Sequence, residues 1–285
     1  MAQGQNIARL IIARLIGGYL LDLDGTVYLG ERLIAGAART IETLRSRGRR
    51  IVFLSNKPLH SRRDYAEKLT RLGVPTTEED VVNSSYVLAR FLAKRAPGAK
   101  VFVIGEEPLC AELRSANLVL TDNPEKIEYV VAAFDRTFDY HKLNIGFQAL
   151  TRGAHFIATN PDRTCPVEGG EIPDAAAVIA ALEATTQKKV ETIVGKPSTY
   201  MTDVALKQLG VPAARASVVG DRLETDVAMG LNAGLISILT LSGVSSREDL
   251  EDSPVRPDYV IESLAELPDL DEQLAEQTRP AGSLP

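Results

Sequence analysis

The chain has 285 residues, of which 45% are hydrophobic and 25% charged, and its formal net charge is −6. These values are typical of a globular protein with one or two domains, and the acidic balance argues against nucleic acid as a partner. The cysteines, Cys110 and Cys165, are too few for a disulfide scaffold and fit a reducing compartment, and no apolar run reaches about 18 residues without a charge, so no membrane span is predicted.

The N-terminal region contains a direct duplication, because residues 7–16 read IARLIIARLI. A secretory signal keeps its charges ahead of a clean apolar stretch, whereas Arg9 and Arg14 interrupt this one. We therefore expect a short N-terminal helix or a frayed extension rather than a targeting segment. At the other end, the tail from Gln277, QTRPAGSLP, is expected to be disordered.

Between these ends, short aliphatic runs alternate with helical patterns. The predicted strands are 19–24, 50–56, 101–105, 129–135, 156–160, 192–196, 217–221 and 236–241. The predicted helices are 36–47, 60–72, 84–95, 108–116, 141–152, 174–186, 199–209 and 225–233. This alternation is typical of βαβ units around a parallel sheet, and continuous apolar strands indicate a sheet covered on both faces. The predicted fold class is therefore α/β with a Rossmann-like parallel-sheet core.

Several predicted strands end in polar side chains. The first reads YLLDLDGT, so three apolar residues run directly into Asp22 and Asp24. Burying an isolated carboxylate is costly, and two acids at the end of a core strand therefore need partners. Other strands end in Ser55 and Asn56, Asn160, Lys196 and Asp221. In open parallel sheets, ligands bind beyond the carboxyl ends of the strands, so we expect these side chains to meet at one edge.

The residue types in this set indicate phosphoryl chemistry. Its carboxylates are Asp22, Asp24, Asp221 and the nearby Asp226. They cannot all be ionised in a small site without a cation, because like charges raise one another's pKa. Oxygen ligands without histidine or cysteine favour Mg²⁺, which usually binds a substrate phosphate as well. A lysine and hydroxyl donors suit phosphoryl transfer, and a carboxylate is the expected nucleophile.

Each of these residues also has a purely structural interpretation. The alternatives are a solvated acidic turn at Asp22 and Asp24, a helix cap at Ser55 and Asn56, a surface lysine at Lys196 and a helix cap at Asp226. Cys165 is expected to be exposed and reduced. Nucleotide-binding motifs are not supported, because VGKPS lacks the glycine-rich lead of a Walker A loop and no GxGxxG occurs.

Four motifs follow one another along the chain: DLDGT at 22–26, LSN at 54–56, VGKP at 194–197 and GDRLETD at 220–226. In this order at strand ends they resemble the haloacid dehalogenase (HAD) superfamily. The likeness is greatest to its phosphatase subclass IIA, the NagD and 4-nitrophenylphosphatase type, and it covers residues 17–265 approximately. The resemblance implies a Mg²⁺-dependent phosphatase that works through an aspartyl-phosphate.

The resemblance also implies a role for each motif residue. Asp22 is the expected nucleophile, and Asp24 is the expected general acid and then general base. The residues expected to bind the substrate's phosphoryl group are Ser55, Asn56 and Lys196, and Lys57 is expected to bind the substrate. The expected Mg²⁺ ligands are Asp22, the main-chain carbonyl of Asp24, Asp221, and Asp226 as a ligand or its support. Within ATNPDRTCP at 158–166, Asn160 and Asp162 match a substrate-facing loop of the family's cap.

The spacing between motifs leaves room for an inserted domain, because Ser55 and Lys196 are 141 residues apart. The resemblance implies that the insert is a cap that excludes water and selects the leaving group. The expected division is 1–96 for the first part of the HAD core, 97–190 for an α/β cap domain and 191–285 for the second part of the core.

The sequence therefore predicts a cytoplasmic, Mg²⁺-dependent phosphatase of small phosphomonoesters, such as sugar phosphates or nucleotides. Two alternatives stay open: a phosphotransferase that uses an acceptor other than water, and a non-catalytic protein that binds a phosphometabolite on the same scaffold. The expected partner is a small phosphorylated metabolite, without nucleic acid or membrane. The resemblance also suggests a homodimer formed through the cap, since dimerisation there is common in the family.

Overall fold

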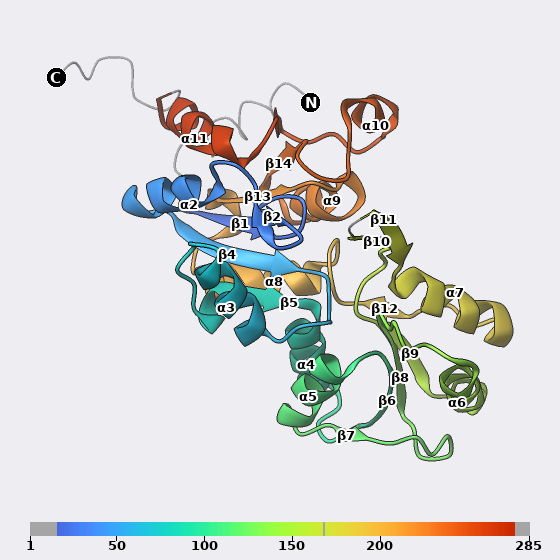
Figure 1. The fold of residues 1–285 in the computed structure, drawn as a ribbon. Helices are drawn as coiled ribbons and strands as arrows, with labels where there is room; N and C mark the ends of the chain where they lie inside the picture. Colours follow the sequence, from blue (N-terminus) through green and yellow to red (C-terminus); the bar gives the residue numbers. More distant parts are fainter. Residues whose placement is uncertain (1–15, 168, 277–285) are drawn as a thin grey trace. The chain divides into compact units, whose positions relative to one another are not determined.

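The structure, a computed structural model, describes residues 16–167 and 169–276 (Figure 1). These residues form two compact units. Of the described residues, the first unit takes those up to Leu54, Lys68–Asp80 and those from Thr202 onward, and the second takes Ser55–Glu67 and Val81–Met201. The predicted helix or extension at 7–16, apart from Ile16, and the predicted tail from Gln277 lie outside the described residues.

A parallel sheet forms the core of the first unit. Its strands pair in the order β15 (Tyr259–Ile261), β14 (Ile236–Thr240), β13 (Ala216–Gly220), β1 (Gly18–Asp22) and β4 (Arg50–Ser55). The central strand β1 is buried along its whole length, as its uninterrupted apolar sequence predicts. The predicted parallel α/β fold is therefore confirmed.

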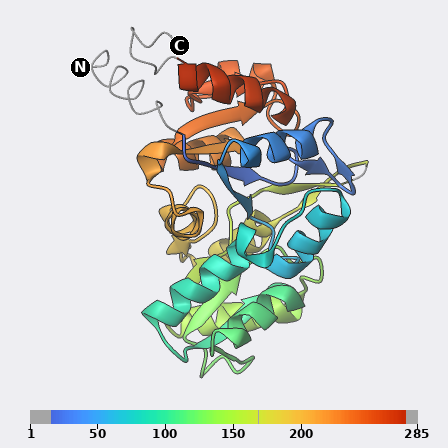
Figure 2. The same ribbon diagram turned by 90° about the vertical axis from the view of Figure 1, so that its left-hand side faces the viewer.

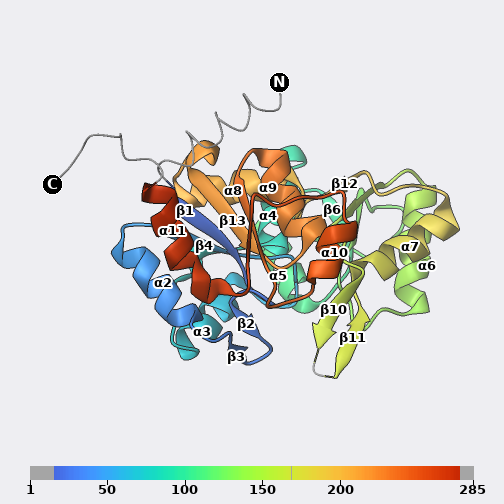
Figure 3. The ribbon, with the colours of Figure 1, turned by 90° about the horizontal axis from the view of Figure 1, so that it is seen from above.

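Helices cover both faces of this sheet. Figure 3 shows α2 (Ala37–Ser46) and α11 (Leu267–Glu276) on one side of β1 and β13, and α8 (Thr199–Leu209) and α9 (Ala228–Ala233) on the other. Helix α2 presents Ala37, Thr40, Ile41 and Leu44 to the interior, which is the spacing of one helical face. The smaller elements of this unit are β2 (Tyr28–Leu29), β3 (Arg32–Leu33), α10 (Arg247–Asp252) and the short helices Glu78–Asp80, Ala213–Arg215 and Leu264–Glu266.

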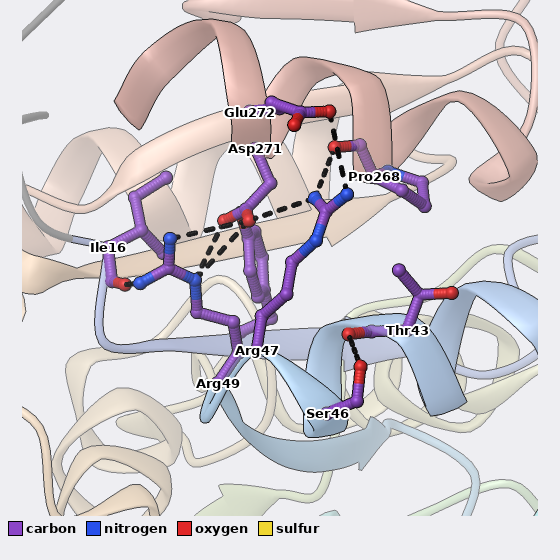
Figure 4. A network of polar contacts seen from close by, with 9 residues as sticks. Ile16, Thr43, Ser46, Arg47, Arg49, Pro268, Asp271 and Glu272 are labelled. Atoms are coloured by element: carbon purple, nitrogen blue, oxygen red, sulfur yellow. Dashed lines mark hydrogen bonds and ion pairs between the residues drawn. The ribbon is translucent and has the colours of Figure 1, made fainter. Parts of the chain in front are cut away.

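Helix α11 is attached to the unit by a buried carboxylate (Figure 4). Asp271 accepts hydrogen bonds from Nε of Arg49 at 2.9 Å and from Nη1 of Arg47 at 3.3 Å. Arg47 also donates to the carbonyl oxygen of Pro268 at 2.6 Å, and Arg49 to that of Ile16 at 2.5 Å. The two arginines thus tie the start of α11, the loop after α2 and the entry to β1 together.

The second unit contains its own parallel sheet. Its strands pair in the order β12 (Thr192–Ile193), β9 (His155–Ala158), β8 (Tyr129–Ala132), β6 (Lys100–Ile104) and β7 (Val119–Leu120). Helices α6 (Tyr140–Thr151) and α7 (Ala175–Thr186) pack together on one face, where Val130 and Phe156 meet Leu150 and Leu182. Helices α4 (Ser84–Arg95) and α5 (Glu107–Ser115) lie on the other face, toward the viewer in Figure 2.

The described part of the second unit also contains three short strands and the beginning of one further helix. Strand β5 (Val81–Asn83) leads into α4, and β10 (Thr164–Val167) pairs antiparallel with β11 (Gly170–Pro173). Helix α3 (Arg62–Arg71) begins in the second unit and ends in the first. The prediction that Cys165 is exposed is wrong: it lies in β10 opposite Ile172 and is only 4% exposed.

The predicted domain boundaries are related to these units in a simple way. The whole predicted cap, 97–190, falls within the second unit, which also includes segments predicted to belong to the core: 55–67, 81–96 and 191–201. The predicted cap was defined by its function, whereas the two units are defined by packing alone. The division into core and cap at residues 96 and 190 therefore stays a prediction.

Candidate active site

The two acids of the first motif lie at the carboxyl end of the central strand β1. Asp22 is opposite Leu54 in the register with β4 and is 7% exposed, whereas Asp24 is half-buried. The hydroxyl of Thr26 donates a hydrogen bond to Oδ2 of Asp22 at 3.3 Å. Gly25 adopts φ of +86°, which a residue with a side chain rarely adopts, and so the chain can turn sharply between the two acids and Thr26.

Two further acids come from the neighbouring strand. Leu21 of β1 is level with Val219 of β13, so Asp221, just past the end of β13, lies at the same edge of the sheet as Asp22. Asp226 follows in a π-helical turn, Leu223–Val227, and its Oδ2 accepts from the main-chain N–H of Arg222 at 3.2 Å. Single π-helical turns are rare and occur frequently at functional sites.

These acids form a compact carboxylate cluster. One oxygen from each of Asp22, Asp221 and Asp226 can be chosen so that all lie within 4.8 Å of one another, and all three residues are buried. We call this group the carboxylate triad. Three ionised carboxylates this close repel one another strongly without a cation, and an oxygen-only donor set is the kind that Mg²⁺ prefers. The residues present therefore fit a magnesium ion.

Glycines make room for the triad. A Cβ at Gly25 would lie 2.7 Å from Cγ of Asp221, and a Cβ at Gly220 would lie 2.6 Å from Oδ2 of Asp226. Distances below about 3 Å are not compatible with non-bonded carbon contacts. Two of the motif glycines are thus required by close packing against the triad, and not only by backbone conformation.

A loop after β14, Ser242–Ser245, holds Asp221 in place. The main-chain N–H of Val244 donates to Oδ2 of Asp221 at 2.7 Å, and that of Ser245 donates to the Asp221 carbonyl at 3.0 Å. The Ser242 hydroxyl donates to the Gly25 carbonyl at 2.7 Å. Sequence analysis missed this loop, because its main-chain donors carry no side-chain signature; LSGVS directly after a core strand was the available signal.

In the second unit, the residues after Leu54 form a small hydroxyl network. Ser55 is buried, and its hydroxyl donates to the phenol oxygen of Tyr65 at 3.1 Å. The Tyr65 hydroxyl in turn donates to the Lys57 carbonyl at 3.1 Å, and the Lys57 main-chain N–H donates to Oγ of Ser55 at 3.2 Å. Tyr65 was not predicted as a site residue, and it orients both Ser55 and the main chain of Lys57.

Asn56 is bound to the main chain of Lys196. Its Oδ1 accepts from the Lys196 N–H at 2.8 Å, and its Nδ2 donates to the Lys196 carbonyl at 3.1 Å. The same Nδ2 donates to Oδ2 of Asp162 at 3.0 Å. Lys196 itself is buried. The interpretation of Ser55 and Asn56 as a simple helix cap therefore does not describe what the Asn56 side chain contacts.

Asn160 is the other amide of this unit. It is fully buried, and its Nδ2 donates to Oδ2 of Asp162 at 2.8 Å and to Oδ1 of Asp174 at 3.0 Å. Asp174 also accepts from the Ala175 N–H at 2.5 Å and caps α7. Burial raises the pKa of Asp174 to about 6. Asp174 was not predicted, although an aspartate after Pro173 at the start of a helix is a recognisable cap.

The structure therefore brings the predicted site residues together in two groups. Within the first unit, Asp22, Asp221 and Asp226 form the triad. The side-chain oxygens of Asp24 do not belong to this group. Within the second unit, Asn56 contacts Asp162 and the main chain of Lys196, and Asn160 contacts Asp162. The predicted role of each residue stays a prediction.

Comparison with known proteins gives consistent similarities. Residues 19–119 match a family described as haloacid dehalogenase-like hydrolase, and residues 193–267 match one described as HAD-hydrolase-like. The sugar-phosphatase AraL of Bacillus subtilis is 42% identical over 256 residues, which cover 90% of this chain and 93% of that protein.

Solved structures agree with these matches. The 4-nitrophenylphosphatase of Thermotoga maritima superposes with a TM-score of 0.86 and 37% identity, covering 91% of this chain and 98% of that one. A glycerol phosphate phosphatase of Mycobacterium tuberculosis, solved in complex with magnesium, gives a TM-score of 0.83 and 34% identity, covering 90% of this chain and 77% of that one.

Proposed function

The chain belongs to the haloacid dehalogenase-like hydrolases, and from this membership we propose that it is a Mg²⁺-dependent phosphatase of small phosphomonoesters acting through an aspartyl-phosphate on Asp22. As an enzyme it is a phosphoric monoester hydrolase of the NagD and 4-nitrophenylphosphatase type. The observation that carries the proposal is the carboxylate triad, which places a buried nucleophile candidate, Asp22, beside two further buried acids. Such a cluster suits a site that binds a cation and a phosphate together.

The first half-reaction uses Asp22 and Asp24. A carboxylate oxygen of Asp22 attacks the phosphorus atom, forming a new P–O bond as the ester P–O bond breaks. The carboxyl of Asp24 gives its proton to the departing oxygen, so the leaving group departs as an alcohol. Asp24 is half-buried, which suits a group that exchanges protons with water between turnovers, whereas Asp22 is buried, which suits a nucleophile kept from solvent.

The second half-reaction reverses the role of Asp24. As a carboxylate it accepts a proton from a water molecule, whose oxygen attacks the phosphorus atom. The bond between phosphorus and the Asp22 oxygen breaks. Inorganic phosphate is released, and the carboxylate of Asp22 is regenerated. The Thr26 hydroxyl donates to Asp22 and thereby keeps the carboxylate in the same orientation for each cycle.

The negative charge that accumulates on the phosphoryl group needs cationic and hydrogen-bonding partners. In the proposed mechanism, Asp22, Asp221, Asp226 and the Asp24 carbonyl would hold Mg²⁺, and the bound ion would neutralise charge on the phosphoryl group. The Lys196 ammonium and Lys57 bind the phosphoryl oxygens. The hydroxyl of Ser55 has one proton, which it donates to Tyr65 in this structure, so that proton turns from Tyr65 to the phosphoryl group when the substrate binds.

For the substrate class, we propose sugar phosphates first, because the sugar-phosphatase AraL is similar over 90% of this chain. A phosphotransferase would differ only in the acceptor that replaces water.

The described helices include none that is long and apolar enough to cross a membrane. A cytoplasmic location and a homodimer through the cap remain part of the proposal, and gel filtration with light scattering tests the latter.

The decisive experiment is phosphate release from a panel of sugar phosphates, nucleoside monophosphates, phosphoglycolate, glycerol phosphate and 4-nitrophenyl phosphate. Each compound is assayed with Mg²⁺, with EDTA and with Asp22→Asn, and alcohol acceptors are added to detect transfer. Release that requires both Mg²⁺ and Asp22 supports the proposal. Phosphate release by the Asp22→Asn variant at the wild-type rate would exclude Asp22 as the nucleophile. A folded protein that binds these esters without cleaving any would be a binding protein.

A further inference from the structure

A chain of four polar residues in the second unit ends on the main chain of Lys196. It runs from Asp174 through Asn160 and Asp162 to Asn56, with contacts of 3.0, 2.8 and 3.0 Å. We propose that these residues, which we call the positioning chain, orient Lys196 for the reaction and are not themselves ligands of the substrate. The inference rests on the proposed function, in which the Lys196 ammonium binds the phosphoryl group.

The donor capacity of the two amides supports a positioning role. An asparagine amide has two N–H groups. Both of those of Asn56 are used, one for the Lys196 carbonyl and one for Asp162. Both of those of Asn160 are used as well, for Asp162 and Asp174, while its Oδ1 accepts from the Thr159 hydroxyl at 2.7 Å. Neither amide can donate to a phosphate unless one of these hydrogen bonds is broken.

Asp162 sets the orientation of the Asn56 amide. A carboxylate can only accept hydrogen bonds, and Oδ2 of Asp162 faces Nδ2 of Asn56. If the amide rotated by half a turn, Oδ1 would face both the Asp162 carboxylate and the Lys196 carbonyl, and Nδ2 would face the Lys196 N–H. Three favourable contacts would become repulsive, so the carboxylate stabilises the one orientation in which Asn56 pairs with both polar groups of the Lys196 main chain.

The approach between Asn56 and Lys196 is close and depends on Gly195. A Cβ at Gly195 would lie 2.6 Å from Oδ1 of Asn56. The Gly195 N–H donates to the Thr159 carbonyl at 2.7 Å, immediately before Asn160. The segment that carries Lys196 is therefore held from two sides, by the end of β9 through Thr159 and by Asn56. Since misplacing a catalytic group by about 1 Å can cost on the order of 100-fold in rate, small losses in this support should affect turnover.

The end of the positioning chain that is farthest from Lys196 is Asp174, at the N-terminus of helix α7. Asp174 is buried and joins Asn160 to the Ala175 N–H. The charged groups that act on it are the Asp162 carboxylate and the Lys57 ammonium. The beginning of α7 is thereby connected, through side chains alone, to the main chain of Lys196. A substitution there should reach Lys196 without touching the phosphate.

The test compares Asn160→Ala with the matched control Asn83→Ala. Both asparagines are fully buried in the second unit, but Asn83 donates to the His60 carbonyl and accepts from the Tyr86 N–H. The first readout is the hydrogen-exchange rate of the Lys196 amide, measured by NMR in the full-length protein without substrate. Losing one link should accelerate this exchange roughly fivefold, while Asn83→Ala leaves it within about twofold of the wild type. Asp162→Ala, at a half-buried position, replaces Asn160→Ala if the latter does not fold.

The second readout is kinetic, as a double-mutant cycle with Lys196→Ala. Asn160→Ala should lower kcat roughly tenfold in the wild-type background and less than about twofold when Lys196 is already alanine. Equal losses in both backgrounds, or unchanged Lys196 exchange, would overturn the positioning role. If the wild type releases no phosphate, the proposed function fails. The hydrogen-exchange experiment still decides whether the positioning chain holds the main chain of Lys196.

Discussion

The hydroxyl of Tyr19 donates a hydrogen bond of 2.7 Å to Oδ1 of Asp271, across 252 positions of sequence. Tyr19 is on the central strand β1 and Asp271 is on the last described helix, α11. Burial and the neighbouring Asp271 carboxylate raise the pKa of Tyr19 well above its ordinary value. The phenol is therefore protonated at neutral pH and acts as a hydrogen-bond donor.

This relationship predicts a large stability effect far from the candidate active site. Asp271→Ala should lower the free energy of unfolding by about 3 kcal/mol, because it removes a buried carboxylate that holds Tyr19, Arg47 and Arg49. Tyr19→Phe should cost about 1.5 kcal/mol, the effect of one hydrogen bond to a charged group. Urea unfolding followed by circular dichroism measures both, since the chain has no tryptophan. Arg114→Ala, which breaks an exposed ion pair with Glu107, should change nothing measurable; a similar loss there would contradict the argument.

The carboxylate triad predicts opposite effects of one substitution with and without metal. In EDTA, Asp226→Asn should stabilise the protein by about 1 kcal/mol, because it removes one of three like charges in a buried cluster. With Mg²⁺ the same variant should lose the stabilisation that metal binding gives the wild type. Thermal unfolding in both conditions is the measurement. The exposed Asp203→Asn serves as control, and a destabilised Asp226→Asn in EDTA would argue against mutual repulsion in the triad.

The loop after β14 predicts that a small substitution disturbs the metal site. A Cβ at Gly243 would lie 2.6 Å from both Cβ and Cγ of Asp221, so Gly243→Ala should displace that carboxylate. The Mg²⁺ concentration for half-maximal activity should rise roughly tenfold or more, equivalent to about 1.4 kcal/mol. Val244→Ala keeps the main-chain N–H that donates to Asp221, and its Mg²⁺ dependence should match the wild type. If the Mg²⁺ concentration for half-maximal activity rose equally in both variants, the effect would come from a general loss of order in the loop and not from displacement of Asp221.

The proposed acid role of Asp24 predicts a dependence on the leaving group. Asp24→Asn cannot protonate the departing oxygen, so kcat with an alkyl phosphate such as a sugar phosphate should fall by roughly 1,000-fold. With 4-nitrophenyl phosphate, whose leaving group is stable as an anion, the first half-reaction should be affected far less. A phosphorylated form of Asp24→Asn should then accumulate and be visible by intact-protein mass spectrometry. The same fractional loss for both substrates, with no such accumulation, would be inconsistent with Asp24 as the acid.

The raised pKa of Asp174 predicts a pH-dependent stability term. Burial raises this pKa to about 6, above the unfolded value of about 3.9, so folding favours the protonated carboxyl. The resulting stabilisation is complete below about pH 4 and is lost as pH rises through about 6. Asn mimics the protonated form at every pH. Asp174→Asn should therefore gain on the order of 2 kcal/mol relative to the wild type between pH 4 and pH 7; parallel stability curves from urea unfolding would refute the raised pKa.

Much of the fold follows from local sequence patterns. Every strand and helix predicted between residues 19 and 241 is present in the structure, with ends that differ by a few residues. The helix predicted at 225–233 differs in type, because its first part is the π-helical turn Leu223–Val227. Most of the elements that sequence analysis missed are very short, such as β7 and the hairpin β10–β11, and the longest is α11, the last described helix. A strand of two to four residues has too little periodicity to be recognised.

The site residues divide in the same way. Asp22, Asp221 and Asp226 could be predicted because each is carried by a recognisable motif at the end of a core strand. Asp174, Tyr65 and the Ser242–Ser245 loop were missed, because a local signal such as a helix cap or LSGVS does not show which distant group a residue contacts. Asn56 and Asn160 were predicted as substrate ligands, yet the structure shows both amides bonded within the protein.

Sequence alone thus determined the order of strands and helices, the parallel α/β class and the positions of the acids, since apolar periodicity and strand-end motifs are local properties of the chain. Only the tertiary structure decided which of these groups meet: Tyr19 with Asp271, Val244 with Asp221, and Asn56 with Lys196. The physical reason is that a hydrogen bond between distant segments depends on atomic positions within about 3 Å, and such precision arises only when the whole sheet and its loops are packed.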